Sequence, residues 1–197
     1  LAVLLIAGFS IQAQVSQNIL PVSQSAHNLL SSVPSFETSP TDHLALFAED
    51  EANANEALPF RFGAYKEVDI DFNNSGQWES LSTGDRVWRL QLVSEGALSL
   101  NFTFDEFFIP SGAMLHIYNE RETLGAYTSD NNQESGAFGT NLIAGDHVTL
   151  EYFEPLAEAG QGSLGLKQII HGYRDIMNTY PNKSALGGSG ACNINVA

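Results

Sequence analysis

"RVWRLQLVSEGALSLNFTF", residues 86–104, contains two runs in which apolar and polar residues alternate, joined by the short turn "SEGA". Alternation with a period of two is typical of a strand that buries one face. The apolar residues that share a face are Trp88, Leu90 and Leu92 in the first run and Leu98, Leu100, Phe102 and Phe104 in the second. Two such runs separated by a turn predict a β-hairpin.

Similar strand-like patterns occur on both sides of this stretch. Strand-sized runs occur at residues 66–72, 113–118, 123–128, 147–153 and 163–173, separated by Gly, Pro and Asn. In the first of these runs Val68, Ile70 and Phe72 share a face, and in the last Leu164, Leu166 and Gln168 do so. No long helical period lies between Arg61 and Tyr173, so we expect an all-β antiparallel sandwich or jelly roll over residues 61–174. The residues expected in its core are Trp88, Leu90, Leu100, Phe102, Leu115, Ile117, Leu150 and Tyr152.

The segments that flank the predicted sandwich differ from it in composition. Residues 14–60 are rich in Ser, Gln, Asn, Ala and Pro, contain no Lys or Arg, and include the acidic stretch "FAEDEANANEA". We predict a weakly ordered acidic leader over 14–60 with one short helix near Leu44–Ala54. Residues 175–186 have the composition of a flexible linker.

The first thirteen residues, "LAVLLIAGFSIQA", open with an apolar run of signal-peptide length. This run is far shorter than the roughly 20 apolar residues that cross a bilayer. We interpret residues 1–13 as the remnant of a secretory signal, cleaved after Ala13. A buried strand or helix start is the alternative interpretation.

The chain has 23 acidic and 8 basic residues among 197, for a formal net charge of −15. Such a surface repels nucleic acids and anionic membranes, so neither is expected as a partner. No segment after the first thirteen residues is apolar for long enough to span a membrane.

No constellation of catalytic or metal-binding residues is recognisable. The five histidines, at positions 27, 43, 116, 147 and 171, lack metal-ligand spacing, and neither a G-x-S-x-G nor a G-D-S-G motif occurs. Asp69, Asp71 and Asn73 have the spacing that begins an EF-hand loop, but the glycine and glutamate that the loop needs are absent. We therefore predict no catalytic residue, no metal site and no cofactor. Trp78 and Trp88 are interpreted as core residues, with stacking on a sugar as the alternative.

Cys192 is the one cysteine of the sequence. An odd cysteine in a secreted chain indicates a reactive thiol or a disulfide partner elsewhere. A reactive thiolate normally has a neighbouring cation or base, and the nearest charged residue is Lys183, nine positions before it. A disulfide with a cysteine beyond Ala197 is the expectation.

"SGACNINV", residues 189–196, resembles the mature N-terminus of secreted bacterial trypsin-fold serine proteases of the lysyl endopeptidase family. Three preceding segments resemble the pro-region of that family. They are "GQWESLSTGDRVWRLQLVSEGALSLNFTFDEFFIPSGAMLHIYN" (76–119), "GDHVTLEYFEP" (145–155) and "IIHGYRD" (169–175). The resemblance covers roughly residues 60–197.

The resemblance implies that residues 61–174 are a pro-region and that residues 187–197 begin a serine protease domain whose catalytic residues lie further along the precursor. Cys192 would be its first structural half-cystine. Lys183, Leu186 and Gly187 mark the candidate processing region; Leu186, not a lysine, precedes Gly187. The implied partners are the chain's own downstream catalytic domain and the protein substrates of the parent enzyme, outside a bacterial cell. The alternative is a non-catalytic β-sandwich module that binds glycans or a surface.

Overall fold

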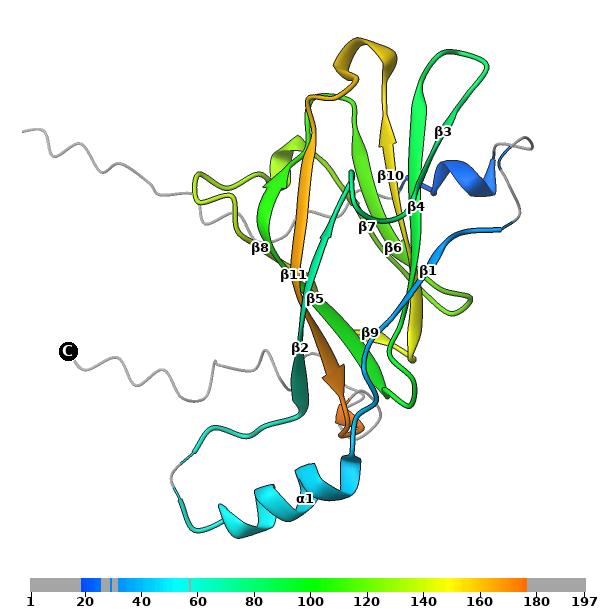
Figure 1. The fold of residues 1–197 in the computed structure, drawn as a ribbon. Helices are drawn as coiled ribbons and strands as arrows, with labels where there is room; N and C mark the ends of the chain where they lie inside the picture. Colours follow the sequence, from blue (N-terminus) through cyan, green and yellow to red (C-terminus); the bar gives the residue numbers. More distant parts are fainter. Residues whose placement is uncertain (1–18, 26–28, 30–31, 57, 177–197) are drawn as a thin grey trace, which may run out of the picture.

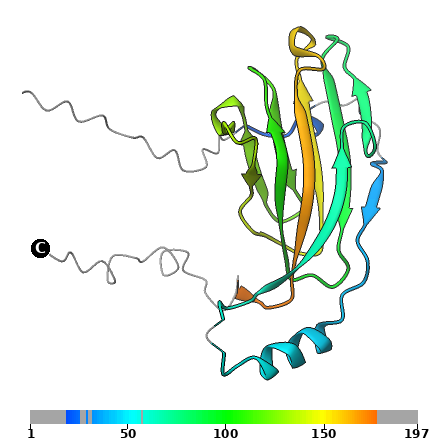
Figure 2. The same cartoon turned by 60° about the vertical axis from the view of Figure 1, so that its left-hand side comes forward.

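A computed structural model describes residues 19–25, 29, 32–56 and 58–176, which form two β-sheets packed face to face (Figures 1 and 2). Sheet A consists, in order, of β1 (Ser35–Glu37), β4 (Arg86–Val93), β10 (His147–Glu154), β6 (Met114–Tyr118) and β7 (Thr123–Tyr127), with β3 (Gln77–Ser80) also paired to β4. Sheet B consists of β2 (Gly63–Asp71), β11 (Ser163–Gly172), β5 (Ser99–Phe108) and β8 (Phe138–Gly139), with β9 (Ile143–Ala144) also paired to β5. The predicted all-β sandwich is confirmed. Three short 3-10 helices (Val22–Gln24, Ser129–Asn131 and Leu156–Glu158) and one α-helix complete the described elements.

The core lies between the sheets and is made by the alternating side chains that the sequence pattern indicates. In sheet A, Leu90 pairs with Leu150, and Leu150 pairs in turn with Ile117, which gives a row of apolar side chains across three strands. All eight residues predicted for the core are at most 2 % exposed. Fully burying a side chain of this size contributes roughly 1.5–3 kcal/mol to stability.

The predicted hairpin between residues 86–93 and 98–104 is wrong, because β4 and β5 lie in different sheets. β4 pairs with β10, β1 and β3, whereas β5 pairs with β11, β8 and β9. The turn after β4 therefore carries the chain across the sandwich instead of back along the same sheet. Both arrangements bury one face of each strand against the same core, so alternation alone does not distinguish them.

A register shift in β11 changes which of its residues face the core. The sequence pattern places Gln168 on the face of Leu164 and Leu166, but a β-bulge lies between Leu166 and Gln168. An extra residue reverses the alternation beyond it, so Ile169 is buried instead, at 1 % exposure. Leu98 also differs from the prediction: it precedes β5 and is 45 % exposed.

The segment predicted as a weakly ordered leader contributes two elements to the fold. β1 pairs in parallel with residues 91–93 of β4, so a three-residue strand from the leader extends sheet A. The predicted short helix is confirmed as α1 (His43–Ala52), which begins where the side chain of Asp42 accepts a hydrogen bond from the backbone of Ala45. Such a cap satisfies one of the free N–H groups at a helix start. The boundary expected at Arg61 thus excludes residues that belong to the sandwich.

Residues 19–25 cover polar side chains on the outer face of sheet A. The backbone N–H of Ser23 donates to Glu151 (3.1 Å), its hydroxyl hydrogen-bonds to Tyr118 (2.9 Å), and His116 Nε2 bonds the carbonyl oxygen of Ile19 (2.8 Å). Glu151 and His116 are therefore buried although they point away from the core. None of the helices in the described ranges is both long and apolar enough to span a bilayer.

Candidate functional site

Three segments meet at the end of the sandwich where β11 finishes: the C-terminal half of α1, the connection from α1 to β2, and residues 173–174 (Figures 1 and 2). Each supplies charged or polar side chains to one cluster, which we call the exit cluster. Its members are Glu49, Asp50, Arg61, Tyr173 and Arg174. Tyr173 and Arg174 directly follow β11, so the chain leaves the sandwich through this cluster.

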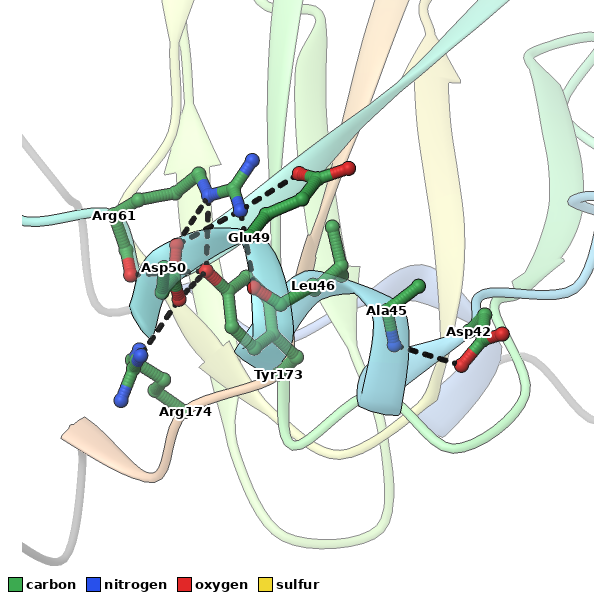
Figure 3. A network of polar contacts seen from close by, with 8 residues as sticks. All are labelled: Asp42, Ala45, Leu46, Glu49, Asp50, Arg61, Tyr173 and Arg174. Atoms are coloured by element: carbon green, nitrogen blue, oxygen red, sulfur yellow. Dashed lines mark hydrogen bonds and ion pairs between the residues drawn. The ribbon is translucent and has the colours of Figure 1, made fainter. Parts of the chain in front are cut away.

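Asp50 is the centre of the exit cluster (Figure 3). Its carboxylate accepts hydrogen bonds from the Tyr173 hydroxyl at 2.6 Å, from Arg174 Nη2 at 2.6 Å and from Arg61 Nε at 2.9 Å. Arg61 Nη2 also contacts Glu49 at 3.0 Å and donates to the carbonyl of Leu46 at 3.2 Å. Two arginines and one tyrosine thus join the helix to the end of the last strand.

The electrostatics of the cluster favour its charged form. Hydrogen bonds from Tyr173 first, then from Arg174 and Arg61, lower the pKa of Asp50 from 3.8 to about 2. The pKa of Arg61 is raised, chiefly by its hydrogen bond to Glu49. The pKa of Arg174 is also raised, chiefly by its hydrogen bond to Asp50. Burial raises the pKa of Tyr173. The network therefore remains intact from neutral pH down to the titration of Asp50.

Aromatic rings surround the two arginines. The rings of Phe47 and Tyr173 meet edge to face with centroids 5.4 Å apart. The guanidinium of Arg174 lies 5.1 Å from the ring centroid of Phe47 and 5.5 Å from that of Phe60. Cation–π contacts of this kind add to the ion pairs.

Replacing Asp50 by asparagine is expected to lower the free energy of unfolding by about 1–2 kcal/mol, because the neutral amide loses three charge-assisted hydrogen bonds at a partly exposed site. Glu51→Gln, an exposed change one position along the same helix, is the control and should cost less than about 0.5 kcal/mol. Denaturant unfolding at neutral pH measures both. Because folding depresses the pKa of Asp50, its contribution is complete above pH 3.8 and is lost as the pH falls towards about 2. Equal effects of the two substitutions at neutral pH would contradict this assignment.

A second set of polar contacts joins the start of α1 to β11. The Nε2 atoms of His43 and His171 lie 2.7 Å apart, so one ring donates a hydrogen bond to the other. The Nδ1 atom of His171 contacts the hydroxyl of Ser94 at 2.8 Å, and Thr38 contacts the same hydroxyl at 2.8 Å. Burial, followed by the charges of His43 and Lys66, lowers the pKa of His171 to about 4.

Ser94 and His171 are the serine and histidine that the described residues bring into contact, and their geometry does not suit acyl transfer. Ser94 is 1 % exposed and His171 is fully buried, so no substrate carbonyl reaches the hydroxyl. The second nitrogen of His171 faces another imidazole, whereas the catalytic triad places a carboxylate there. We therefore interpret this pair as structural.

Two clefts flank the connection between α1 and β2. One, of about 420 Å³, lies between the end of α1 and Arg174, and the other, of about 460 Å³, lies over the outer face of sheet B. Both are lined by Pro59, Phe60 and Arg61. Asn101 also lines the second cleft. These clefts are large enough for several protein side chains or a short peptide.

The predicted site residues and the acids with EF-hand-like spacing, which were not predicted to bind a metal, differ in whether the structure describes them. Cys192, Lys183, Leu186 and Gly187 lie outside the described residues. Asp69 and Asp71 are described: Asp69 contacts Lys167 at 3.5 Å, and Asp71 accepts from the backbone of Asn74 at 2.9 Å. Within the described ranges, no three His, Cys, Asp or Glu side chains converge as metal ligands do.

The two tryptophans differ in their surroundings. Trp88 is fully buried, as predicted. Trp78 is partly buried, and its ring contacts Phe72, Tyr152 and the guanidinium of Arg86.

The exit cluster was not predicted from the sequence. Arg61 is the first basic residue of the chain and follows a stretch of acids, which is a weak signal for an ion pair between them. Nothing local indicates that Tyr173 and Arg174, more than 120 positions away from Asp50, meet the same acid. No family model matches the chain.

Proposed function

We propose that the sandwich is the pro-region of a secreted bacterial serine endopeptidase precursor of the lysyl endopeptidase type, and that it assists the folding or the latency of the catalytic domain that follows it. The segments that resemble this pro-region lie on β3–β6, on β10 and at the end of β11. The segment that resembles a mature protease N-terminus, residues 189–196, comes after β11 in the sequence. A pro-region followed by a mature N-terminus is the order expected of a protease precursor.

The observation that supports the proposal is that the described residues form a two-sheet sandwich in which the contact between Ser94 and His171 is closed to substrate. Acyl transfer needs an activated nucleophile together with donors that stabilise an oxyanion. The Ser94–His171 contact is buried and lacks a carboxylate partner. A sandwich whose Ser94–His171 pair is closed to substrate is compatible with a pro-region that acts by binding.

The proposal predicts that the purified chain of 197 residues hydrolyses neither peptide esters nor peptide amides. The full-length precursor should mature to an active endopeptidase, and deletion of residues 14–176 should lower the yield of active enzyme by about tenfold or more, since an unassisted catalytic domain is lost to misfolding. Hydrolysis of a fluorogenic peptide library measures both. Turnover by the 197-residue chain that Ser94→Ala abolishes would place the catalytic centre in the sandwich and contradict the proposal.

Cys192 has a defined role in this proposal: it forms a disulfide with a cysteine of the catalytic domain and tethers the new N-terminus after cleavage in the region Lys183–Gly187. Such a bond stabilises a domain by about 2–4 kcal/mol. Mass spectrometry of the secreted, full-length protein after alkylation without reduction tests it. An alkylated Cys192 shows a free thiol and contradicts the disulfide.

A glycan-binding module is the second candidate, and one cleft favours it. This cleft, of about 300 Å³, is lined by Trp78 and by polar side chains that include Asp71, Arg86, Glu106 and Glu154. Aromatic rings beside hydrogen-bonding groups suit a sugar, although Phe72, Tyr152 and Arg86 already contact the Trp78 ring. Titration with oligosaccharides, followed by tryptophan fluorescence in the wild type and in Trp78→Phe, tests this candidate.

A further inference from the structure

Large apolar side chains are exposed beside the exit cluster. Phe47, Leu58, Phe60 and Tyr65 are 41 %, 59 %, 67 % and 72 % exposed, and we call the surface that they form the exit face. The four belong to one surface: Arg174 lies against both Phe47 and Phe60, one cleft is lined by Leu58 and Phe60, and the other by Phe60 and Tyr65. Single exposed apolar residues are common, whereas a group around two clefts is typical of an interaction surface.

The polar groups of the exit face indicate what kind of surface it would contact. Around the cleft at the end of α1, Glu56 and the exposed Glu51 add negative charge beyond that balanced by Arg61 and Arg174. The matching surface is therefore apolar at its centre and neutral or basic at its rim.

The described part of the chain ends beside this face. The backbone N–H groups of Tyr173 and Arg174 both donate to the carbonyl of Phe62, at 3.0 and 3.2 Å. Together with the contacts of Asp50, these bonds fix the point of exit next to Phe60 and Phe62. A domain joined after Ile176 is therefore held at a high effective concentration near the exit face.

We propose that the exit face is the docking surface for the domain that follows Ile176, with Leu58 and Phe60 as its central contacts. The identity of this partner as a catalytic domain rests on the proposed function, whereas the location of the surface rests on the geometry of the exit. A contact centred on two large apolar side chains is expected to be sensitive to their truncation.

The test compares two double variants of the 197-residue chain. Leu58→Ser with Phe60→Ser changes the exit face. The matched control is Phe108→Ser with Leu156→Ser, which removes side chains that are 47 % and 60 % exposed at the opposite end of the sandwich. Each chain is titrated calorimetrically into the downstream domain, isolated after processing of the precursor. We expect the exit-face variant to bind about tenfold more weakly or worse and the control to change by less than about twofold. Far-UV circular dichroism and thermal unfolding establish that both variants fold.

Three outcomes overturn the inference: equal losses for the two variants, no binding of the wild-type chain, or self-association of the chain that the exit-face variant abolishes while binding to the domain is unchanged. Hydrogen exchange in the full-length precursor gives a second measurement. The amides of residues 58–62 should exchange more slowly there than in the 197-residue chain, and equal exchange contradicts docking. If the isolated domain hydrolyses no peptide, the proposed function fails, but the same titration still decides whether that domain docks on the exit face.

Discussion

Replacing Trp88 by alanine is expected to lower the free energy of unfolding by about 3–5 kcal/mol, the range found for large aromatic residues in well-packed cores. The Trp88 side chain is fully buried. It packs edge to face on Phe72 with ring centroids 5.2 Å apart, and its Nε1 donates to the carbonyl of Ser75 at 2.9 Å. The substitution therefore removes a large apolar surface and leaves the partly buried carbonyl of Ser75 without this donor.

The turn at Gly76 adds to this cost, because it is built directly against the Trp88 indole. Gly76 has a φ of +71°, and a Cβ atom there would lie 2.5 Å from the ring. Loss of the ring leaves this turn without support. Since domains are stable by about 5–15 kcal/mol, the variant should be marginal or unfolded at 37 °C.

Chemical denaturation at 25 °C measures this effect, and Leu98→Ala is the control. Leu98 belongs to the same predicted alternation but is 45 % exposed, so its replacement should cost less than about 0.5 kcal/mol. A cost below about 1 kcal/mol for Trp88→Ala would show that the indole is not packed as described.

The sequence predicts the strands well because their core-facing side chains are apolar and alternate with more polar ones. The alternation at residues 86–93 and 147–153 is visible without knowing which strands pair. The pairing itself depends on contacts between distant residues, such as Leu90 with Leu150. For this reason the core residues were predicted correctly, while the hairpin between β4 and β5 was not. The bulge in β11 was missed because one extra residue leaves no mark in composition.

The end of the sandwich shows the limit of such reasoning more clearly. Asp50 and His43 lie in a segment whose composition indicates a solvated leader, and each contacts a residue more than 120 positions away. Contacts with β11 and with the two residues that follow it give these side chains their roles, and only the fold brings them together. The predicted residues around Cys192 lie outside the described residues, so their roles stay predictions.

Lowering the pH is expected to destabilise the sandwich through His171 before Asp50 titrates. The pKa of His171 is about 4 in the folded chain, against 6.5 for an exposed histidine. Burial is the main cause, the charges of His43 and Lys66 add to it, and Asp146 opposes it. Because the unfolded chain binds this proton more readily than the folded chain, stability is complete above the unfolded pKa. It falls as the pH drops from 6.5 to about 4, by about 3 kcal/mol in total.

The histidine contact also gives this loss a structural location. His171 bonds His43 through one nitrogen and Ser94 through the other. Protonation of His171 makes both of its ring nitrogens donors and places a positive charge in a fully buried site against His43. The start of α1 should therefore separate from β11 as the pH falls, while the Asp50 network at the other end of the helix is still charged. The protection factors of the Ala45 and Leu46 amides, which hydrogen-bond to Asp42, should fall first as the pH approaches 5.

The decisive measurement is the slope of the unfolding free energy against pH in His171→Gln. Near pH 5 the wild-type slope should contain about 1.4 kcal/mol per pH unit from one proton taken up on unfolding, and the variant should lack it.

His147→Gln is the control: hydrogen bonding to Asp146 raises the pKa of His147, and its side chain is 40 % exposed. Its contribution is small and of opposite sign, because a raised pKa stabilises the folded chain at low pH and the stability is lost as the pH rises. The two variants distinguish the histidines. At acidic pH, the plot of unfolding free energy against pH should become flatter in His171→Gln, whereas in His147→Gln it should stay as steep or become steeper. If the unfolding free energy of His171→Gln kept the full wild-type slope at acidic pH, neither this histidine nor its contact with α1 would be the cause of acid unfolding.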